Sequence, residues 1–304
     1  MAFTFTILGS SSALPTSERF TSAHVLNICE RFFLIDCGEG TQMQLRKYKI
    51  KMGRINHIFI SHIHGDHVFG LFGLISSFNL LGRENDLHIF GPPDLERIIH
   101  GYLKDFYINL YYEIIFHPVN CTRSVRIYED DKIKVNTIPL KHRIPTCGFL
   151  FREQPALPNL KKDKIEKYNI PISQRKGIKE GDSFTKENDV VVPNHELVIH
   201  PPEPKAFAYC SDTSYNEGIL TQINNVDLLY HEATYGNDLQ EMARESMHST
   251  AGEAASLARK ASVKKLVIGH FSARYKDLSP LLTEAQNEFK NTFLAEDGKV
   301  FTVE

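Results

Sequence analysis

The sequence lacks the features that mark secreted and membrane-spanning proteins. Its five cysteines are scattered, odd in number and without a Cys-x-x-Cys pair, which argues against a disulfide framework and for reduced thiols. Residues 1–8 carry no basic leader and alternate like a strand, so they do not read as a signal peptide. The longest apolar stretch, residues 68–81, is too short and too polar to span a bilayer. We therefore expect a soluble, cytoplasmic protein.

The chain also lacks a strong net charge. Its formal charge is −2 at pH 7, so any binding to nucleic acid must come from local basic patches. Hydrophobic residues make up 42% of the 304 residues, which is enough apolar material for one large domain or two ordinary ones.

One short segment, Ser61 to Val68, concentrates metal-binding side chains. It holds His62, His64, Asp66 and His67 between an apolar run that predicts a strand and an apolar run that predicts a helix starting at Val68. Imidazole and carboxylate groups are ligands that zinc prefers, and four of them exceed what one ion usually takes from so short a segment. A polar loop with coincidental histidines is disfavoured, because ionisable groups beside buried apolar runs are costly.

Polar residues recur at the ends of the predicted strands. Strand ends on one edge of a sheet converge on a common crevice, so these residues are expected to lie together. They are Asp36, the His62–His67 turn, His142, Asp212, His231 with Glu232, and His270. The remaining histidines that we considered read as surface or core residues: His57, His88, His100, His117, His195 and His200.

The apolar pattern predicts a chain of alternating strands and helices. Strands are expected at 3–7, 23–28, 31–35, 58–60, 87–90, 114–119, 124–128, 132–140, 206–210, 226–230 and 263–268. Helices are expected from Gln42 with Thr41 as its cap, at 93–106, at 251–261 with a Thr250–Glu253 capping box, and near the C-terminus before a last strand.

Three segments have two readings each. The loop Leu8–Thr16 is either a plain turn, which composition favours, or a phosphate-binding loop. Asp36 is either an ordinary turn residue or a group that orients a metal-bound histidine. Residues 151–204, rich in proline and lysine, are either a solvated loop or an inserted functional arm that lacks a sustained core pattern.

The quoted residues carry a family resemblance. His62-Ile63-His64-Gly65-Asp66-His67 resembles the signature of the metallo-β-lactamase superfamily. Within that superfamily, the chain resembles the ribonuclease Z family, endonucleases that trim precursor tRNA. The stretches that carry this second resemblance are Asp36–Gln42, Leu140–His142, Ser211–Thr213, His231–Thr234 with His248–Thr250, and Gly269–Tyr275.

The resemblance implies a site with two zinc ions, with manganese as a possible substitute. His62, His64 and His142 would hold one ion, Asp66, His67 and His270 the other, and Asp212 would bridge them. His248, oriented by Glu232, would protonate the leaving oxygen, and Asp66 would also accept a proton from the attacking water.

The fold expected from the resemblance is a four-layer αββα sandwich, an α/β class. Residues 1–150 and 205–304 would form the catalytic domain, and 151–204 an inserted tRNA-binding arm. The implied activity is zinc-dependent endonucleolytic removal of the 3′ trailer from precursor tRNA by a homodimer. The products would be a 3′-hydroxyl on the tRNA and a 5′-phosphate on the trailer. Two alternatives stay open: another dinuclear hydrolase of this fold acting on small phosphodiesters or esters, and an RNA-binding protein with a structural metal.

Overall fold

The structure of the protein is a computed structural model, which describes residues 3–186 and 189–304. Residues 1 and 2 of the N-terminal stretch, and residues 187 and 188 of the expected arm, lie outside the described residues. The chain divides into two compact units, one that runs to Arg152 and resumes at Lys205, and one from Glu153 to Pro204. Each unit is described by itself.

The first sheet of the larger unit has seven strands in the order β18-β1-β2-β3-β4-β5-β6. Strands β2 and β3 form the expected hairpin, because Cys29 and Glu30 both adopt the left-handed conformation of a tight two-residue turn. From β3 to β6 the strands are parallel. The strands are β1 (Phe3–Gly9), β2 (Ala23–Ile28), β3 (Arg31–Cys37), β4 (Ile55–Phe59), β5 (Leu87–Gly91), β6 (Ile114–Pro118) and β18 (Val300–Thr302).

The second sheet also has seven strands, in the order β17-β16-β15-β14-β9-β8-β7. One of them, β9, is absent from the prediction. The buried alternation of Cys147, Phe149 and Phe151 continues past residue 150, and the larger unit runs to Arg152. The strands are β7 (Arg126–Glu129), β8 (Ile133–Pro139), β9 (Cys147–Glu153), β14 (Ala206–Cys210), β15 (Leu228–Glu232), β16 (Leu266–Gly269) and β17 (Thr292–Leu294).

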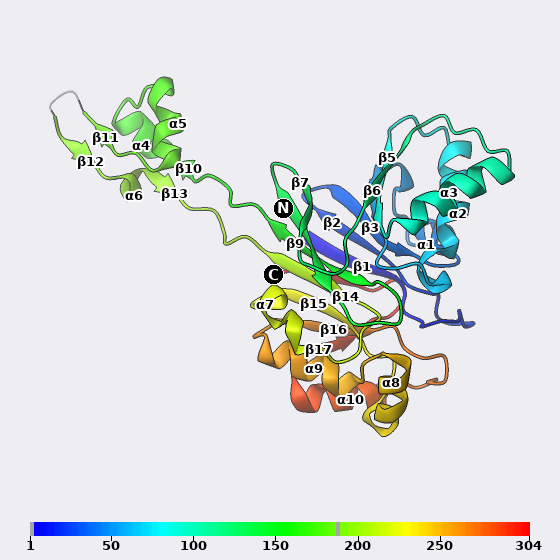
Figure 1. The fold of residues 1–304 in the computed structure, drawn as a ribbon. Helices are drawn as coiled ribbons and strands as arrows, with labels where there is room; N and C mark the ends of the chain where they lie inside the picture. Colours follow the sequence, from blue (N-terminus) through cyan, green and yellow to red (C-terminus); the bar gives the residue numbers. More distant parts are fainter. Residues whose placement is uncertain (1–2, 187–188) are drawn as a thin grey trace. The chain divides into compact units, whose positions relative to one another are not determined.

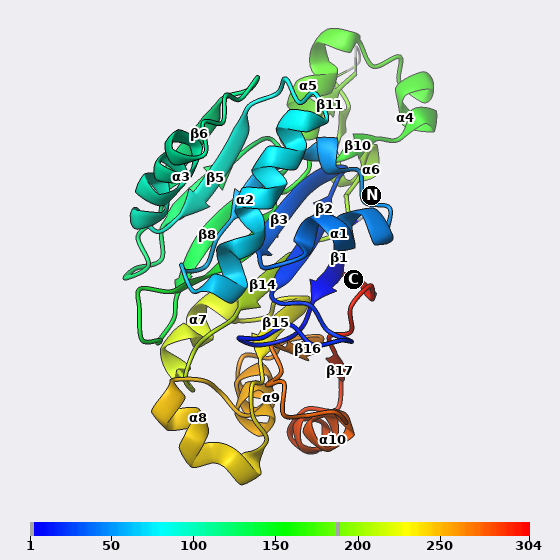
Figure 2. The ribbon, with the colours of Figure 1, turned by 90° about the vertical axis from the view of Figure 1, so that its right-hand side faces the viewer.

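Helices cover the outer face of each sheet, which confirms the four-layer αββα prediction (Figures 1 and 2). An apolar cluster joins α1, α2 and α3 to the first sheet, and a larger cluster fills the space between the sheets and reaches α9 and α10. The helices are α1 (Thr41–Lys47), α2 (Gly65–Leu80), α3 (Asp94–Asp105), α7 (Leu220–Ile223), α8 (Gln240–Ser246), α9 (Ala251–Lys260) and α10 (Ser279–Glu288), with short 3-10 helices at Met52–Arg54, Glu217–Ile219 and Asn237–Leu239. No helix among the described residues has the length and apolar character needed to cross a membrane.

Two predicted helix starts are wrong and one is confirmed. Helix α2 begins at Gly65 rather than Val68, so Asp66 and His67 lie in its first turn, where an acidic side chain favours the helix dipole. Thr41 is the first residue of α1 and not its cap, because its hydroxyl donates to the carbonyl of Gly38 at 2.6 Å. The capping box of Thr250 and Glu253 at the start of α9 is confirmed.

A close backbone approach brings α2 to the end of β3. A Cβ atom at Gly70 would lie 1.9 Å from the carbonyl oxygen of Gly38, and one at Gly38 would lie 2.4 Å from the carbonyl oxygen of Asp66. Only glycine permits this contact at both positions. The contact sets the first turn of α2 against the C-terminal end of β3, which carries Asp36.

The smaller unit has a core of its own, although its sequence shows no sustained core pattern. Its core consists of Ile170, Ile178, Phe184, Val192, Leu197 and Val198. Five of these side chains come from five short elements, one from each, and Ile170 lies in the connection between two helices, so no single element shows a helical or strand period. The elements are β10 (Asn159–Leu160), α4 (Lys162–Lys167), α5 (Ile172–Glu180), β11 (Phe184–Thr185), β12 (Val191–Val192), α6 (Asn194–Leu197) and β13 (Val198–Ile199).

Candidate active site

The polar residues at the strand ends converge on one crevice of the larger unit, with the exception of His231. That side chain is buried elsewhere, and its Nδ1 atom lies 2.8 Å from the backbone carbonyl oxygen of Glu232. Asp36, Asp212 and His270 follow or end β3, β14 and β16, and each has a positive φ, at 56°, 53° and 58°. This left-handed backbone turns the chain sharply at the strand end and costs about 1–3 kcal/mol at each residue that is not glycine. The rest of the fold stabilises these turns, which hold the three side chains in the crevice.

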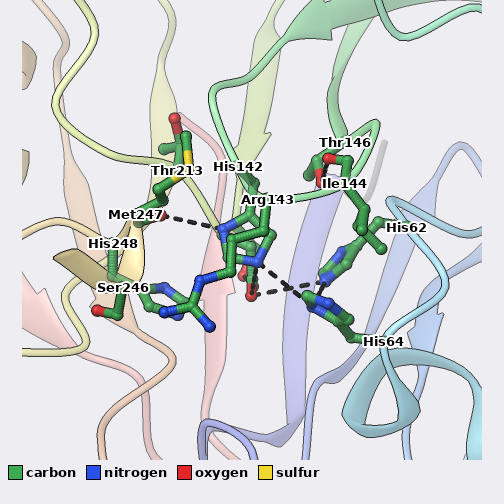
Figure 3. Close-up of polar contacts among 12 residues, drawn as sticks. His62, His64, His142, Arg143, Ile144, Thr146, Thr213, Ser246, Met247 and His248 are labelled. Carbon is green, nitrogen blue, oxygen red and sulfur yellow. Dashed lines mark hydrogen bonds and ion pairs between the residues drawn. The ribbon is translucent and has the colours of Figure 1, made fainter. Parts of the chain in front are cut away.

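A first group of donor atoms joins His62, His64 and His142. The Nδ1 atom of His64 lies 3.0 Å from Nε2 of His62 and 3.3 Å from Nε2 of His142. The Oδ2 atom of Asp212 lies 3.5 Å from Nε2 of His62 and 3.6 Å from Nε2 of His142. Figure 3 shows His62, His64 and His142 turned toward one another. These four side chains can therefore face one metal ion.

A second group joins Asp66, His67 and His270. The Nε2 atoms of His67 and His270 lie 3.3 Å apart, and Oδ2 of Asp66 lies 3.5 Å and 3.4 Å from them. The other carboxylate oxygen of Asp212, Oδ1, lies 3.1 Å from Nε2 of His67 and 3.2 Å from Nε2 of His270. Asp212 thus presents one oxygen to each group.

The chemistry of both groups fits a divalent metal ion. Two ligands of one zinc ion lie roughly 3.3 Å apart when each is about 2.0–2.1 Å from the metal, and the observed separations are close to this value. Burial lowers the pKa of His62, His64 and His142, so these imidazoles stay neutral, which is the form that binds a metal. The other ring nitrogen of His142 donates to the carbonyl of Met247 at 3.0 Å, which fixes the tautomer.

Asp36 contacts His67 of the second group through the ring nitrogen that faces away from the donor atoms. This carboxylate is fully buried, and its Oδ2 lies 2.8 Å from Nδ1 of His67. The Ser61 amide donates to Oδ1 at 2.8 Å, and the hydroxyls of Ser61 and Tyr209 donate to Oδ2 at 2.9 and 2.7 Å. With Nδ1 of His67 held in this way, its Nε2 faces the donor group. Sequence reasoning missed Tyr209, because an aromatic residue inside a strand reads as core.

His248 and Glu232 form a buried ion pair beside the donor groups. The Nδ1 atom of His248 lies 2.8 Å from Oε1 of Glu232, which also accepts the Thr213 amide at 2.8 Å. Burial opposes protonation of the imidazole, but the Glu232 carboxylate outweighs it and raises the pKa of His248 to about 9. The hydroxyl of Thr234 donates to Oε2 of Glu232 at 2.6 Å and lies 3.0 Å from Nδ1 of His270, so it links the pair to the donor groups.

The donor groups open into a cavity of about 160 Å³. The loop after β1 forms part of its wall, where the Ala13 amide donates to Oδ2 of Asp66 at 2.8 Å. The amides of Ser11 and Ser12 donate to the carbonyls of Phe20 and Phe271, so three of the loop's amides are occupied within the protein. This agrees with the plain-turn reading of the loop. Arg143 and Ser246 also line the cavity, and sequence reasoning missed both.

The histidines left out of the predicted site lie elsewhere. His57, His88 and His117 are half-buried on β4, β5 and β6, where Nδ1 of His88 lies 3.0 Å from Nε2 of His117. The side chains of His100, His195 and His200 are exposed. Of the described residues that line the cavity, none belongs to this set.

Comparison with known proteins places the fold in a broad class. The metallo-β-lactamase fold protein YhfI from Bacillus subtilis superimposes with a TM-score of 0.69 at 17% identity, over 99% of this chain and 100% of that one. This likeness assigns the metallo-β-lactamase fold to the chain, and the two donor groups lie within that fold. Residues 3–159, about half of the chain, match the family model described as Anti-Pycsar protein Apyc1, so this half belongs to that family.

Relatives along the whole chain define a narrower family. Ribonuclease Z of Phocaeicola vulgatus is 48% identical over 298 residues, which cover 98% of this chain and 96% of the relative. The crystal structure of the short form of human tRNase Z matches with a TM-score of 0.72 and 27% identity, over 99% of both chains. The chain belongs to the ribonuclease Z family and is an endonuclease.

Proposed function

We propose that this endonuclease removes the 3′ trailer from precursor tRNA with two zinc ions, leaving a 3′-hydroxyl on the tRNA and a 5′-phosphate on the trailer. The observation that carries the proposal is the pair of donor groups that share Asp212 beside the His248–Glu232 ion pair. The tRNA substrate is supported by the ribonuclease Z and tRNase Z relatives, which match nearly the whole chain.

The metal ligands follow from the two donor groups. His62, His64 and His142 would hold one ion, Asp66, His67 and His270 would hold the second, and Asp212 would bridge them. When bound, two divalent ions lower the pKa of a water and offset negative charge on the attacking and leaving oxygens of a phosphodiester. Zinc fits a donor set of imidazoles and carboxylates, and manganese is a second candidate for the carboxylate-rich group.

Two protein groups handle the protons. His248 carries its proton on the cavity wall and donates it to the departing 3′-oxygen, while Glu232 holds the ring in position and favours its charged form. Asp66, which also lines the cavity, accepts a proton from the attacking water in addition to its role as a ligand.

The smaller unit supplies contacts to the body of the tRNA in this proposal. A cavity of about 760 Å³ in this unit is lined by Lys162, Arg175 and Lys179, together with Lys161. Lys161 and Arg175 donate to backbone carbonyls within the unit, which leaves Lys162 and Lys179 as the better candidates for phosphate contacts. Replacing both lysines by alanine should weaken cleavage of tRNA and spare a single-phosphate diester; equal loss on both substrates contradicts the assignment.

A homodimer and a cytoplasmic location complete the proposal. Met43 on α1, Leu80 on α2 and Leu81 after it are 61%, 86% and 56% exposed around one groove, and such a patch suits a second copy of the chain. Sedimentation would give a dimer mass for the wild type and a monomer for Leu80→Glu. The five free thiols suit a reducing compartment, and cell fractionation tests the location.

Incubation of the purified protein with a 3′-extended tRNA and zinc or manganese tests the function. We expect one cut that yields mature-length tRNA with a 3′-hydroxyl and a trailer with a 5′-phosphate. Binding of the tRNA without cleavage would instead favour an RNA-binding protein with a structural metal. Cleavage of small phosphodiesters alone would favour another dinuclear hydrolase of this fold.

A further inference from the structure

Arg143 lines the active-site cavity but has no role in the proposed chemistry. It follows His142 directly in the chain, and its side chain is exposed. Its Nη2 atom lies 3.3 Å from the carbonyl oxygen of Glu245, to which it donates. Within residues 3–186 and 189–304 this is its one hydrogen bond, and it forms no ion pair with a carboxylate. The described residues therefore leave most of its N–H donors free.

The contact with Glu245 fixes the side of the cavity on which the guanidinium lies. Glu245 begins the segment that runs through Ser246 and Met247 to His248, and Met247 also accepts the hydrogen bond from His142. In Figure 3 the side chain of Arg143 extends toward Ser246 and His248 and away from His62 and His64. Arginine has five N–H donors, so four remain for a ligand. Among the described residues that line the cavity, Arg143 is the only lysine or arginine.

We infer that Arg143 binds the phosphate that precedes the last nucleotide of the mature tRNA, one linkage upstream of the cut. This inference rests on the proposed function, because it takes His248 as the proton donor to the departing 3′-oxygen. The departing nucleotide then lies on the His248 side of the cavity, and the phosphate on its 5′ side is the next anion along that strand. A guanidinium matches a phosphate with two parallel hydrogen bonds, which orients the departing strand as well as attracting it.

The test combines a protein variant with a substrate variant. Wild type, Arg143→Ala and Arg143→Lys are compared on a 3′-extended tRNA with a natural upstream linkage and on one with an uncharged methylphosphonate at that linkage. Arg143→Ala should lower kcat/KM by about 10- to 100-fold on the natural substrate, the size expected for a lost charge-assisted contact. Arg143→Lys should recover part of the rate, because it keeps the charge without the planar fork.

The losses in kcat/KM caused by the protein variant and by the substrate variant should not multiply. If Arg143 and the upstream phosphate contact each other, Arg143→Ala should cause little further loss on the methylphosphonate substrate. A full loss from Arg143→Ala on that substrate overturns the inference. Arg97→Ala, at an exposed position on α3, is the matched control and should match the wild type in rate and thermal midpoint. If the wild type cleaves the tRNA and this cleavage depends on His248, but the losses from the two changes multiply, only the role of Arg143 is rejected. If the wild type does not cleave the tRNA, the proposed function is rejected as well.

Discussion

The proposed role of His248 as proton donor can be tested by changing the atom that departs from the phosphate. Glu232 is fully buried and accepts four hydrogen bonds, from the amide of Thr213, the amide and hydroxyl of Thr234, and Nδ1 of His248. Glu232→Gln keeps the shape but removes the charge, and its amide group would face N–H and O–H donors. We expect the variant to lose about 1.5–3 kcal/mol of the free energy of unfolding, as a charge-assisted hydrogen bond is lost.

The effect on the rate differs between the two partners. Removing a general acid costs roughly 10²- to 10⁴-fold, so His248→Ala should lower kcat on a 3′-extended tRNA by that factor. Glu232→Gln leaves the imidazole in place but weakens its positioning and its charged form. Loss of about 1.5–3 kcal/mol of that interaction corresponds to roughly a 10- to 150-fold lower rate.

A substrate with sulfur in place of the departing 3′-oxygen separates proton donation from other roles. A thiol has a pKa of about 8.5, so sulfur departs as a thiolate near neutral pH without a proton donor. On this substrate both variants should lose less than about tenfold relative to the wild type, because the remaining loss reflects positioning only. Single-turnover rates on the oxygen and sulfur linkages, measured at one metal concentration, give the comparison.

Glu217→Gln is the matched control for this experiment. Glu217 is an exposed glutamate of the same unit that pairs with Lys260, and its replacement should leave both rates unchanged. Equal losses on the oxygen and sulfur linkages for His248→Ala would refute its role as proton donor, provided that the thermal midpoint of the variant stays near that of the wild type.

Three further predictions concern metal binding and stability. Asp36→Asn should weaken metal binding about 10- to 100-fold in a chelator competition, because the support of His67 is weakened; unchanged affinity would contradict that role. Burial, and next the neighbouring His88, lower the pKa of His57 to about 4, so the unfolded chain binds a proton between pH 6.5 and 4 that the folded chain does not. The free energy of unfolding therefore decreases as the pH is lowered from 6.5 to 4. In urea titrations, this decrease should be smaller for His57→Gln than for the wild type, by about 1–2 kcal/mol. An equal decrease in both proteins would refute the assignment. Thr250→Ala should cost about 1 kcal/mol through loss of the capping box, and a loss below about 0.3 kcal/mol in urea would contradict it.

The sequence predicted which residues meet in the two donor groups because their signal is local. A strand is visible as an apolar run, and a polar residue that follows it must lie at an edge of the sheet. His62, His142 and Asp212 were found in this way, and the structure brings them within hydrogen-bond range of one another or nearly so. The left-handed turns at Asp36 and His270 carry no such signal, since the residue types do not reveal the backbone angle.

The features that the sequence did not predict depend on contacts between distant segments. Tyr209 reads as a core aromatic, and its contact with Asp36 spans 173 positions in the chain. The core of the smaller unit is assembled from short elements, each of which contributes one or two side chains, so no window shows a period. Strand β9 was not predicted, and it pairs with β14, which follows the insertion in the chain.

The residues of the donor groups come from both sheets, so the first half of the chain does not contain the complete site. Residues 3–159, which match the Apyc1 model, contain His62, His64 and His142 but lack Asp212 and His270 of the two donor groups. The Glu232–His248 pair also lies in the second half. The proposed metal centre would therefore form only when β14 and β16 of the second sheet dock against the first sheet. Asp212 and His248, the proposed bridge and proton donor, both come from the half of the chain outside that match, so variants in this half test the proposed chemistry most directly.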